Sequence, residues 1–488
     1  MAHELETAAE PQKLRRIAID PISRVEGHGK ITLLMDDDGH VQQARLHIVE
    51  FRGFEKFVQG RPYWEAPVMV QRLCGICPVS HQIAAAKALD HVVGAVPPPP
   101  SAEKMRRLMH YGQIVQSHAL HFFLLSSPDL LFGFDAELDR RNIVAVAERY
   151  PEVARRGVAL RRWGQEVIRH TSGKRVHGTG AVPGGINKLL SASERDALLA
   201  EADQMISWSK AAVELAQKLA AANEREFAQF GFFRSSLMSL VRSDGGFEFY
   251  DGLLRGRDEE GAILFDGVRD QEYDKLITEE VKSWSYMKFP YLRARGREEG
   301  WYKVGPLARV QNCDFMPTPL AEAERRAFVA AAEGKINHAP LAYHWTRMIE
   351  MLHAAELIRE LLDDPDLLRG ETMGSGPRGR SGVGIIEAPR GTLIHHYEVG
   401  DDDLITMCNL IVSTTHNNQA MNEAVREVAR RDLDGRRITE GLLNHVEVVI
   451  RAFDPCLSCA THALGKMPLI LELVAPDGAR IDRKVRNA

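Results

Sequence analysis

Hydrophobic positions recur at helical spacing through much of the chain, and this pattern predicts a mainly helical protein. The longest periodic stretches predict helices at about 101–126, 136–148, 151–170, 193–230, 320–332, 341–363, 419–431 and 439–452. Pro78 predicts the start of a further helix that runs to about Val93, because proline is favoured at the first helical position. Ser101 is the expected N-cap of the next helix.

Shorter alternating stretches predict strands at 17–20, 30–34 and 44–49, with a turn at Asp36–Gly39 between the last two. A second hairpin is expected from 247–250 and 262–265, and further strands after 385, including 410–415. The segments 173–188 and 370–384 are expected to be loops. The predicted fold class is α+β, mainly α, with a large helical core and small N-terminal and peripheral β-sheets.

Neither an internal repeat nor a clean linker divides the chain, so we expect one domain over 17–462 after a flexible tail at 1–16. The composition, 44% hydrophobic and 26% charged, is that of a folded protein. A net charge of -5 gives no reason to expect nucleic acid as a partner. The N-terminus is polar and no apolar run could span a membrane, which predicts a cytoplasmic protein without a membrane partner.

Four of the six cysteines form two C-x-x-C pairs, Cys74 with Cys77 and Cys456 with Cys459. A histidine follows each pair, at His81 and at His462. In a reducing compartment such pairs indicate metal or redox chemistry rather than disulfides. Cys77 stands at the expected helix start, where the helix dipole favours a thiolate. Cys313 and Cys408 have no paired spacing and are expected to be buried apolar residues.

The spacing alone is equally compatible with a structural zinc site of four cysteines. Against zinc, the pairs lie nearly the whole chain apart, and a chain of this length has ample core without a metal staple. A thioredoxin-like dithiol is disfavoured because neither pair follows a strand in a βαβ pattern. Thiolates also bind nickel, copper(I) and iron, and the pattern does not choose among these metals.

Five motifs, in order, make the chain resemble the large subunit of nickel–iron hydrogenases over essentially its full length: Asp20–Gly29, Phe51–Glu55, Arg72–Cys77, Glu387–Gly391 and Asp454–Cys459. Related respiratory complex I subunits share that fold but lack the cysteines. Within the family, the segments 54–58, 77–81 and 460–465 are most similar to the cytoplasmic bidirectional NAD-reducing type, although NADP- and deazaflavin-linked relatives have similar motifs.

The resemblance implies reversible heterolytic cleavage of H2 at a nickel–iron centre. Cys74 and Cys456 would be terminal nickel ligands, and Cys77 and Cys459 would bridge nickel to an iron that carries CO and cyanide. Glu26 would take the proton onward from Cys456. The simpler alternative for Glu26 is a salt bridge with Arg24 near the surface.

The resemblance also implies a set of residues around the iron and its ligands. Arg390 would face the diatomic ligands, with Pro389 shaping the pocket and Asp454 orienting the guanidinium. His81 would donate to the Cys77 sulfur, although a lone histidine there is more often a satisfied core residue. Other expected neighbours are Thr414 or Thr415 at the second cyanide, His118, and Ser117, where the family commonly has an aspartate.

Further implications concern magnesium, maturation and partners. Glu55 and His462 would bind Mg2+. Nickel-insertion proteins and a maturation endopeptidase would act on the chain, and the endopeptidase would remove residues 463–488. A small subunit with an iron–sulfur cluster would face His177, and flavin- and iron–sulfur-containing diaphorase subunits would complete the complex. This chain has too few cysteines for an iron–sulfur cluster of its own and no glycine fingerprint for NAD.

Overall fold

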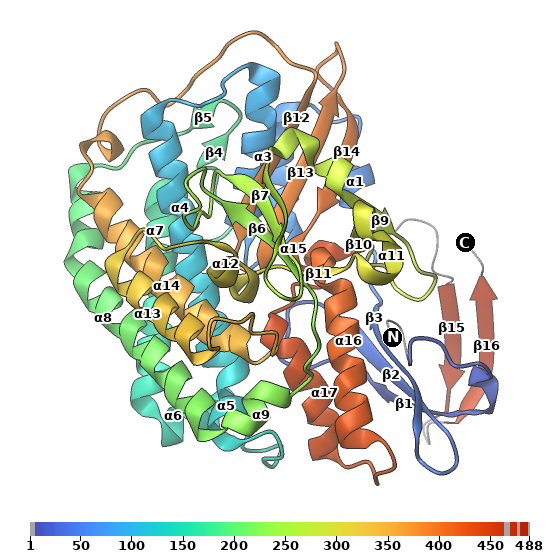
Figure 1. Cartoon of the computed structure of the whole chain (residues 1–488). Helices are drawn as coiled ribbons and strands as arrows, with labels where there is room; N and C mark the ends of the chain where they lie inside the picture. Colours follow the sequence, from blue (N-terminus) through green and yellow to red (C-terminus); the bar gives the residue numbers. More distant parts are fainter. Residues whose placement is uncertain (1–4, 463–468, 476–478, 487–488) are drawn as a thin grey trace.

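The computed structural model describes residues 5–462, 469–475 and 479–486. Helices fill the left and lower parts of the molecule in Figure 1, and small sheets lie on the right and through the centre. The helices are α1 (Phe54–Phe57), α2 (Ala66–Val70), α3 (Pro78–Val93), α4 (Pro100–Leu120), α5 (Ser127–Phe132), α6 (Ile143–Arg149), α7 (Pro151–Ser172), α8 (Ala192–Ala222), α9 (Glu224–Gln229), α10 (Tyr273–Leu276), α11 (Gly296–Glu299), α12 (Pro306–Asn312), α13 (Pro319–Ala331), α14 (Ala342–Leu362), α15 (Ser413–His416), α16 (Asn418–Val428) and α17 (Glu440–Phe453).

The strands form separate small sheets rather than one large one. They are β1 (Arg15–Ile19), β2 (Gly29–Met35), β3 (Val41–Ile48), β4 (Ala181–Val182), β5 (Gly185–Ile186), β6 (Ser236–Val241), β7 (Leu253–Arg257), β8 (Ile263–Val268), β9 (Ile277–Glu280), β10 (Phe289–Leu292), β11 (Tyr302–Lys303), β12 (Ser381–Ala388), β13 (Gly391–Val399), β14 (Ile405–Ile411), β15 (Leu469–Val474) and β16 (Arg480–Arg486). The sheet orders are β1-β2-β3, β11-β6-β7-β8, β12-β13-β14 and the pairs β10-β9, β4-β5 and β15-β16. The predicted class, mainly α with small sheets, is confirmed.

Most predicted helices are confirmed, but two predictions at helix starts were wrong and one predicted helix changes type near its end. The helix beginning at Pro100 has no side-chain cap, and Ser101 lies inside it and donates to the Arg369 carbonyl over 3.1 Å. The helix expected from residue 136 begins only at Ile143, because the Asn142 side chain accepts from two backbone N–H groups and caps it there. The helix expected to reach residue 126 is α-helical only to Leu120 and continues as π-helix over His121–Ser126.

The strand predictions hold for the N-terminal hairpin and for 262–265, which overlaps β8, but fail for 247–250 and for the end of 410–415. The second hairpin pairs β7 with β8, whereas 247–250 is not a strand but a buried aromatic loop. Burial of Phe247 and Phe249 against the helical core gives this loop the alternation of a strand, although Phe247 makes only an isolated bridge, to Val241, among the described residues. The strand expected over 410–415 ends at Ile411, and Ser413–His416 is a short helix.

The described part of the expected tail contacts the body of the protein. The Ala44 N–H donates to the Leu5 carbonyl over 2.8 Å, and Glu6 pairs with Lys282 over 2.6 Å. The division of the chain into tail, domain and extension stays a prediction. Of the extension, 463–468, 476–478 and 487–488 lie outside the described residues, and the rest forms the β15–β16 pair at the right of Figure 1.

Close packing of α3 on β12 positions the first cysteine pair. The contact is made by small residues: a side chain on Gly384 would collide with the Ala84 carbonyl of α3. One apolar cluster contains this helix, parts of β12, β13 and β14, and all four paired cysteines. The helix therefore holds Cys77 beside the end of β12, where Ala388 leads into Arg390.

The N-terminal loop meets the second cysteine pair directly. Glu26 and Cys456 form a parallel bridge, and the Leu457 N–H donates to the Glu26 carbonyl over 3.0 Å. Gly27 has φ +82°, and a side chain there would come within 2.6 Å of the Ser458 nitrogen. Because glycine at position 27 allows this close approach, the N-terminal loop and the segment with the second cysteine pair meet at the site.

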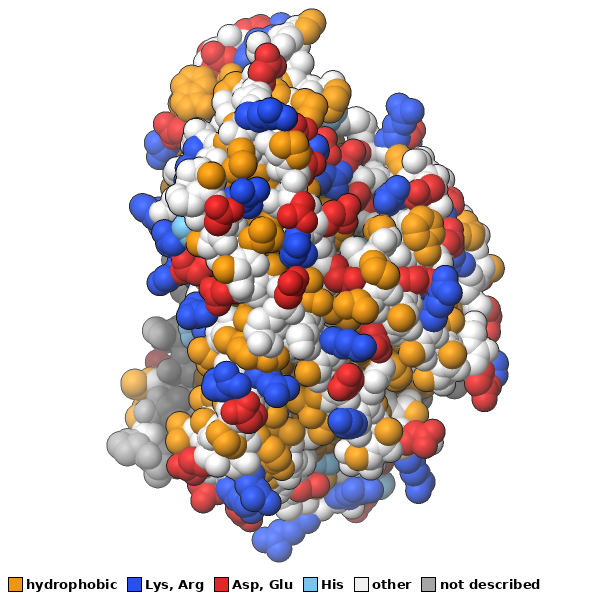
Figure 2. Space-filling model, turned by 90° about the vertical axis from the view of Figure 1, so that its left-hand side faces the viewer, with side chains coloured by type: hydrophobic (Ala, Val, Ile, Leu, Met, Phe, Trp, Pro, Cys, Tyr) orange, Lys and Arg blue, Asp and Glu red, His pale blue; other side chains and the backbone are white. Residues whose placement is uncertain are grey.

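On the side of the molecule where α8 lies in Figure 1, the surface carries a mixture of positive and negative side chains. Figure 2 shows that side, with Lys and Arg interspersed among Asp, Glu and apolar side chains. Each described helix is too short or too polar to cross a lipid bilayer.

Candidate metal centre

The four paired cysteines converge at one buried point. Their sulfur atoms lie within 4.8 Å of one another, with 3.2 Å between the Cys74 and Cys456 sulfurs and 3.9 Å between those of Cys77 and Cys459. Among the described residues, no other group of three or more Cys, His, Asp or Glu side chains is placed to share a metal ion. The structure therefore joins two pairs that stand at opposite ends of the sequence.

Backbone geometry at both pairs turns the thiols inward. Cys77 is the N-cap of α3, and its N–H and that of Ile76 donate to the Cys74 sulfur over 3.3 and 3.2 Å. On the other side, Asp454 ends α17 in the left-handed conformation, with φ 55°. An aspartate tolerates that conformation better than most residues, and the turn carries Cys456 back toward the cluster.

The electrostatics of the cluster favour a thiolate at Cys74. Burial alone opposes the charge, but thiol hydrogen bonds from the other cysteines and the Arg390 charge lower the pKa of Cys74 well below its usual range. Burial raises the pKa of Cys456 and of Cys459. A soft metal cation bound by these sulfurs would supply the positive charge that favours loss of their protons.

Glu26 lies against the cluster and not against Arg24. The Cys456 thiol donates to Glu26 Oε2 over 3.0 Å, and the Ser458 N–H donates to the same oxygen over 3.1 Å. Arg24 instead pairs with Asp129 over 2.6 Å, so the simpler salt-bridge interpretation was wrong. Burial, followed by the charge of Cys74, raises the pKa of Glu26. A carboxyl group with a raised pKa beside a thiol can exchange protons with it.

A small cavity opens beside Cys77 and Cys456. Arg390, Pro389, His81 and Thr414 line it, together with Ser80, Ala388, Leu393, Val412 and Ser413. Arg390 donates from Nη2 to Asp454 Oδ1 over 2.9 Å, while its Nε and Nη1 have no partner among the described residues. The Ser80 hydroxyl is likewise buried without a described partner. Unpaired buried donors around thiolates fit a metal centre whose ligands accept hydrogen bonds, as cyanide nitrogen does.

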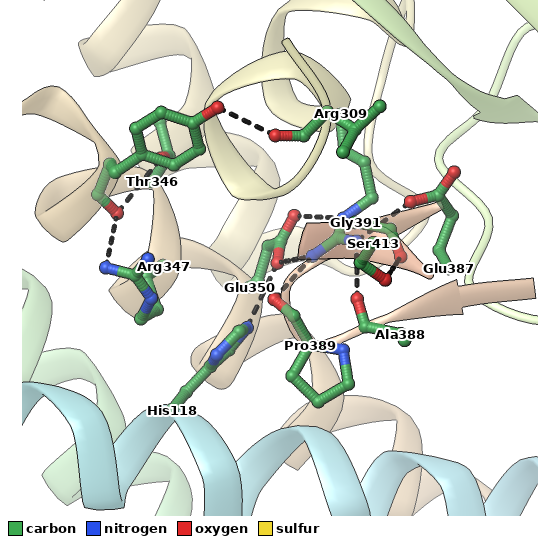
Figure 3. A network of polar contacts seen from close by, with 12 residues as sticks. His118, Arg309, Thr346, Arg347, Glu350, Glu387, Ala388, Pro389, Gly391 and Ser413 are labelled. Atoms are coloured by element: carbon green, nitrogen blue, oxygen red, sulfur yellow. Dashed lines mark hydrogen bonds and ion pairs between the residues drawn. The ribbon is translucent and has the colours of Figure 1, made fainter. Parts of the chain in front are cut away.

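An ionic network behind the cavity fixes the segment that precedes Arg390 (Figure 3). Arg309 is fully buried and binds Glu350 with two hydrogen bonds of 2.7 and 2.6 Å. It also donates to Glu387 over 2.8 Å and to the carbonyls of Ala388 and Pro389 over 2.7 and 3.3 Å. This guanidinium thus anchors the backbone that carries Pro389 and Arg390 to the cavity.

Three expected neighbours of the centre do not line the cavity. His118 belongs to the ionic network, where its Nε2 lies 3.0 Å from Glu350 Oε2. Ser117 and Thr415 are buried, and neither hydroxyl has a partner among the described residues. Thr414, in contrast, accepts the Cys456 N–H over 2.9 Å and lines the cavity, which separates the two threonines that the sequence left undecided.

The expected magnesium residues lie in adjoining segments. The N–H groups of Arg52 and Gly53 both donate to the Thr461 carbonyl, which places Glu55 near His462. The Glu55 carboxylate accepts from the Leu410 N–H over 2.9 Å and contacts the Lys288 ammonium at 3.0 and 3.2 Å. His462 Nε2 lies 2.8 Å from the Cys459 carbonyl oxygen, and its Nδ1 has no partner in the described residues.

His177 lies at the surface side of the cluster. Its Nε2 is 3.1 Å from the Cys74 carbonyl oxygen and its Nδ1 is 3.1 Å from Arg72 Nη1. Arg72 and Gly75 are exposed, so the cysteine loop comes close to the protein surface here. Cys313 and Cys408 are buried free thiols, as predicted.

Sequence reasoning missed several residues that shape the site. Arg309 and Glu350 carry no local signal, because they come together only through packing of α12 and α14. Ser80 was detectable, since it lies three residues after Cys77 on the same helix face. His395 and Tyr397 were also detectable as alternate residues on one face of a strand.

The comparisons with known proteins agree on one family. The profile described as nickel-dependent hydrogenase matches residues 52–155 and 247–462, and the profile described as HoxL-like matches 16–51. The chain is 46% identical to subunit beta of the NAD-reducing hydrogenase HoxS of Cupriavidus necator, over 97% of this chain and 100% of that one. It is 40% identical to a chain of the F420-non-reducing hydrogenase vhc of Methanococcus voltae, over 96% and 99%.

Solved structures give the same result. The fold superposes on a crystal structure of an NAD+-reducing [NiFe]-hydrogenase in the H2-reduced state with a TM-score of 0.90 and 61% identity, covering 92% of this chain and 99% of that one. The Ni-Fe-Se hydrogenase of Desulfovibrio vulgaris Hildenborough matches with a TM-score of 0.73 and 23% identity, over 92% and 100%. At that identity the likeness concerns the fold alone.

Proposed function

We infer the function of this chain from one premise: it belongs to the family of nickel-dependent hydrogenases, as a large subunit. Its four clustered cysteines fit a nickel–iron centre. Family membership decides against the structural zinc site and the thioredoxin-like dithiol that the cysteine spacing left open. The intact cysteines decide against a silent, complex I-like subunit.

The proposed reaction is the reversible cleavage of H2 into protons and electrons, with NAD+ as the final electron acceptor. The observation that carries it is the convergence of four buried sulfurs beside a carboxyl group and a cavity lined by unpaired donors. When bound, a nickel–iron pair supplies the Lewis acid and redox chemistry. The similarity to NAD-reducing hydrogenases supports NAD+ as the acceptor.

The chain's own residues divide the remaining work. All four cysteines would hold the metals, with Cys74 and Cys456 as terminal ligands and Cys77 and Cys459 as bridging ligands. Glu26 would exchange a proton with the Cys456 thiol across their 3.0 Å contact. The unpaired Nε–H and Nη1–H groups of Arg390, with the guanidinium held by Asp454, would bind the acceptor ends of CO and cyanide ligands on iron.

Electrons would leave through a small subunit with an iron–sulfur cluster and then through flavin- and iron–sulfur-containing diaphorase subunits. The surface near His177 and Arg72 supports this exit, because His177 contacts the Cys74 carbonyl. Apolar side chains are exposed on the segment that leads to this loop: Phe51, Phe57, Trp64 and Val68 are 45%, 53%, 52% and 38% exposed. A partner that docks on this segment would bury these apolar side chains.

The magnesium and maturation proposals rest on the family resemblance. A magnesium ion at Glu55 and His462 would have to share the Glu55 carboxylate with Lys288. Magnesium analysis of the purified complex tests this, with one ion per chain expected and a lower content in Glu55→Gln. Nickel-insertion proteins and an endopeptidase that removes residues 463–488 would complete maturation, in the cytoplasm.

An activity assay on the purified complex tests the proposed function. The wild type is expected to reduce both NAD+ and a viologen dye with H2, and Cys456→Ser is expected to reduce neither. Dye reduction without NAD+ reduction would assign a different acceptor. Absence of both activities from a complex that contains nickel and iron would contradict the proposal.

A further inference from the structure

A row of buried polar side chains runs from the cavity into the sheet β12-β13-β14. His81, which lines the cavity, places its Nδ1 3.2 Å from His395 Nε2. His395 Nδ1 lies 2.8 Å from the Tyr397 hydroxyl. Tyr397 faces Cys408 across β13 and β14, and its side chain interacts with the thiol. The exposed fractions are 1%, 0%, 0% and 6%, so water does not compete for these contacts.

Both histidines are neutral in this environment. Burial lowers the pKa of His81 to about 4 and that of His395 well below its usual range. A neutral imidazole carries one N–H donor and one bare acceptor nitrogen. In the contact between the two rings one nitrogen must donate and the other accept, so the tautomers of His81 and His395 are linked.

The tyrosine sets the direction of the row. Its hydroxyl has two neighbours, an imidazole nitrogen and a thiol, and the imidazole nitrogen is much the stronger acceptor. The Tyr397 O–H therefore donates to His395 Nδ1. His395 then carries its hydrogen on Nε2 and donates to His81 Nδ1. His81 in turn carries its hydrogen on Nε2, the nitrogen that His395 leaves free.

We propose that Tyr397 is a positioning residue that acts through His395 to hold His81 as the Nε2–H tautomer. The tautomer presents an N–H group toward the cavity beside Cys77, where thiolates and metal-bound ligands accept hydrogen bonds. The row ends at the Cys408 thiol, whose pKa burial raises well above its usual range. It therefore ends at a group that keeps its proton. This inference rests on the nickel–iron centre of the proposed function.

Infrared spectra of the purified complex test the proposal, because the CO and cyanide stretches respond to hydrogen-bond donors around the centre. Tyr397→Phe removes only the hydroxyl, and it is expected to shift these bands and to lower H2-dependent dye reduction about 10-fold. The matched control is Tyr273→Phe. Tyr273 contacts His396, the next residue of β13, over 3.1 Å, and removal of its hydroxyl is expected to leave the bands unchanged.

A second pair of variants decides the question if Tyr397→Phe does not fold. His395→Leu removes the donor to His81 and is expected to shift the bands. His395→Gln supplies an amide N–H to His81 Nδ1 and is expected to restore them toward the wild type. Unshifted bands in Tyr397→Phe, or equal bands in the two His395 variants, would overturn the positioning role. Absence of the bands from the wild type would instead overturn the proposed function beneath it.

Discussion

Arg309 and Arg390 are both buried in the same part of the molecule, and their surroundings differ. Arg309 is held by two carboxylates and two carbonyls, all supplied by the chain. Arg390 has one carboxylate, Asp454, and keeps two nitrogens without a partner among the described residues. A buried donor that the protein leaves unpaired indicates a ligand, and a fully paired one indicates a structural role. The contrast separates the ionic network behind the cavity from Arg390, which lines the cavity beside Cys77 and Cys456.

The sharpest test of this contrast removes a proposed metal ligand. Cys77→Ser is expected to abolish H2-dependent dye reduction and to lower the nickel and iron content, because the centre loses one sulfur. The fold should survive, since the thiol is a small part of a large apolar cluster. Metal analysis and circular dichroism of the purified chain check both parts. Loss of folding in Cys77→Ser would point to a structural metal instead, and Cys313→Ser serves as the control for a buried cysteine outside the site.

The next largest effect is expected at the structural arginine. Arg309→Met leaves the carboxylates of Glu350 and Glu387 buried without their partner, which should lower the free energy of unfolding by about 3–5 kcal/mol. Urea unfolding of the chain measures this. Arg309→Lys retains the charge but not the planar set of donors, so we expect an intermediate loss. A stability change within about 0.5 kcal/mol in Arg309→Met would contradict the structural role.

Substitution of Arg390 should disturb stability less and the centre more. Burial raises the pKa of Asp454, so this carboxyl group can take up a proton when its partner is removed. We expect Arg390→Met to lower the free energy of unfolding by about 1–3 kcal/mol and to remove H2 activity. Equal losses of stability in Arg309→Met and Arg390→Met would erase the distinction between the two arginines.

Acid should lower the free energy of unfolding through His353, which lies beside the ionic network. Burial lowers the pKa of His353 to about 3, while the unfolded chain keeps its usual value near 6.5. The unfolded state therefore binds more protons between these values, and the free energy of unfolding should fall by about 1.4 kcal/mol per pH unit below about 6.5 for this residue. Urea unfolding at pH 7.5 and 5.5 measures the loss, and His353→Gln should reduce it.

His445 offers a control of opposite sign. Its side chain lies between Asp432 and Asp135, at 3.0 and 3.1 Å. Burial opposes its charge, but the two carboxylates prevail and raise its pKa. The contribution of His445 to the free energy of unfolding is present below about pH 6.5 and is lost as the pH rises through the folded pKa. His445 should therefore raise the free energy of unfolding in acid by up to about 1 kcal/mol. If the free energy of unfolding fell less from pH 7.5 to pH 5.5 in His445→Gln than in the wild type, this sign would be contradicted.

The sequence predicted the four cysteines that cluster and most helices, for clear physical reasons. The cysteine pairs are local patterns, and long amphipathic helices such as 151–170 and 341–363 have a strong period. The meeting of Glu26 with Cys456 followed only from the family motif, because the two residues are far apart in the chain. Arg309 and Glu350 stayed hidden, since burial and pairing of charges depend on packing between distant elements.

The errors also have local causes. Ser101 has the chemistry of an N-cap, but proline at 100 already begins the helix and leaves the serine inside it. The aromatic alternation at 247–250 resembles a strand because burial on one side produces the same pattern. Ser117 and His118 share a helix face with His110 and His121, yet that face serves the ionic network and the core rather than the cavity.

An infrared spectrum of the purified complex, with nickel and iron quantified on the same sample, tests the nickel–iron centre most directly. We expect CO and cyanide stretches together with one nickel per chain. Zinc in place of nickel, with no such bands in a folded and fully processed chain, would contradict the proposed centre.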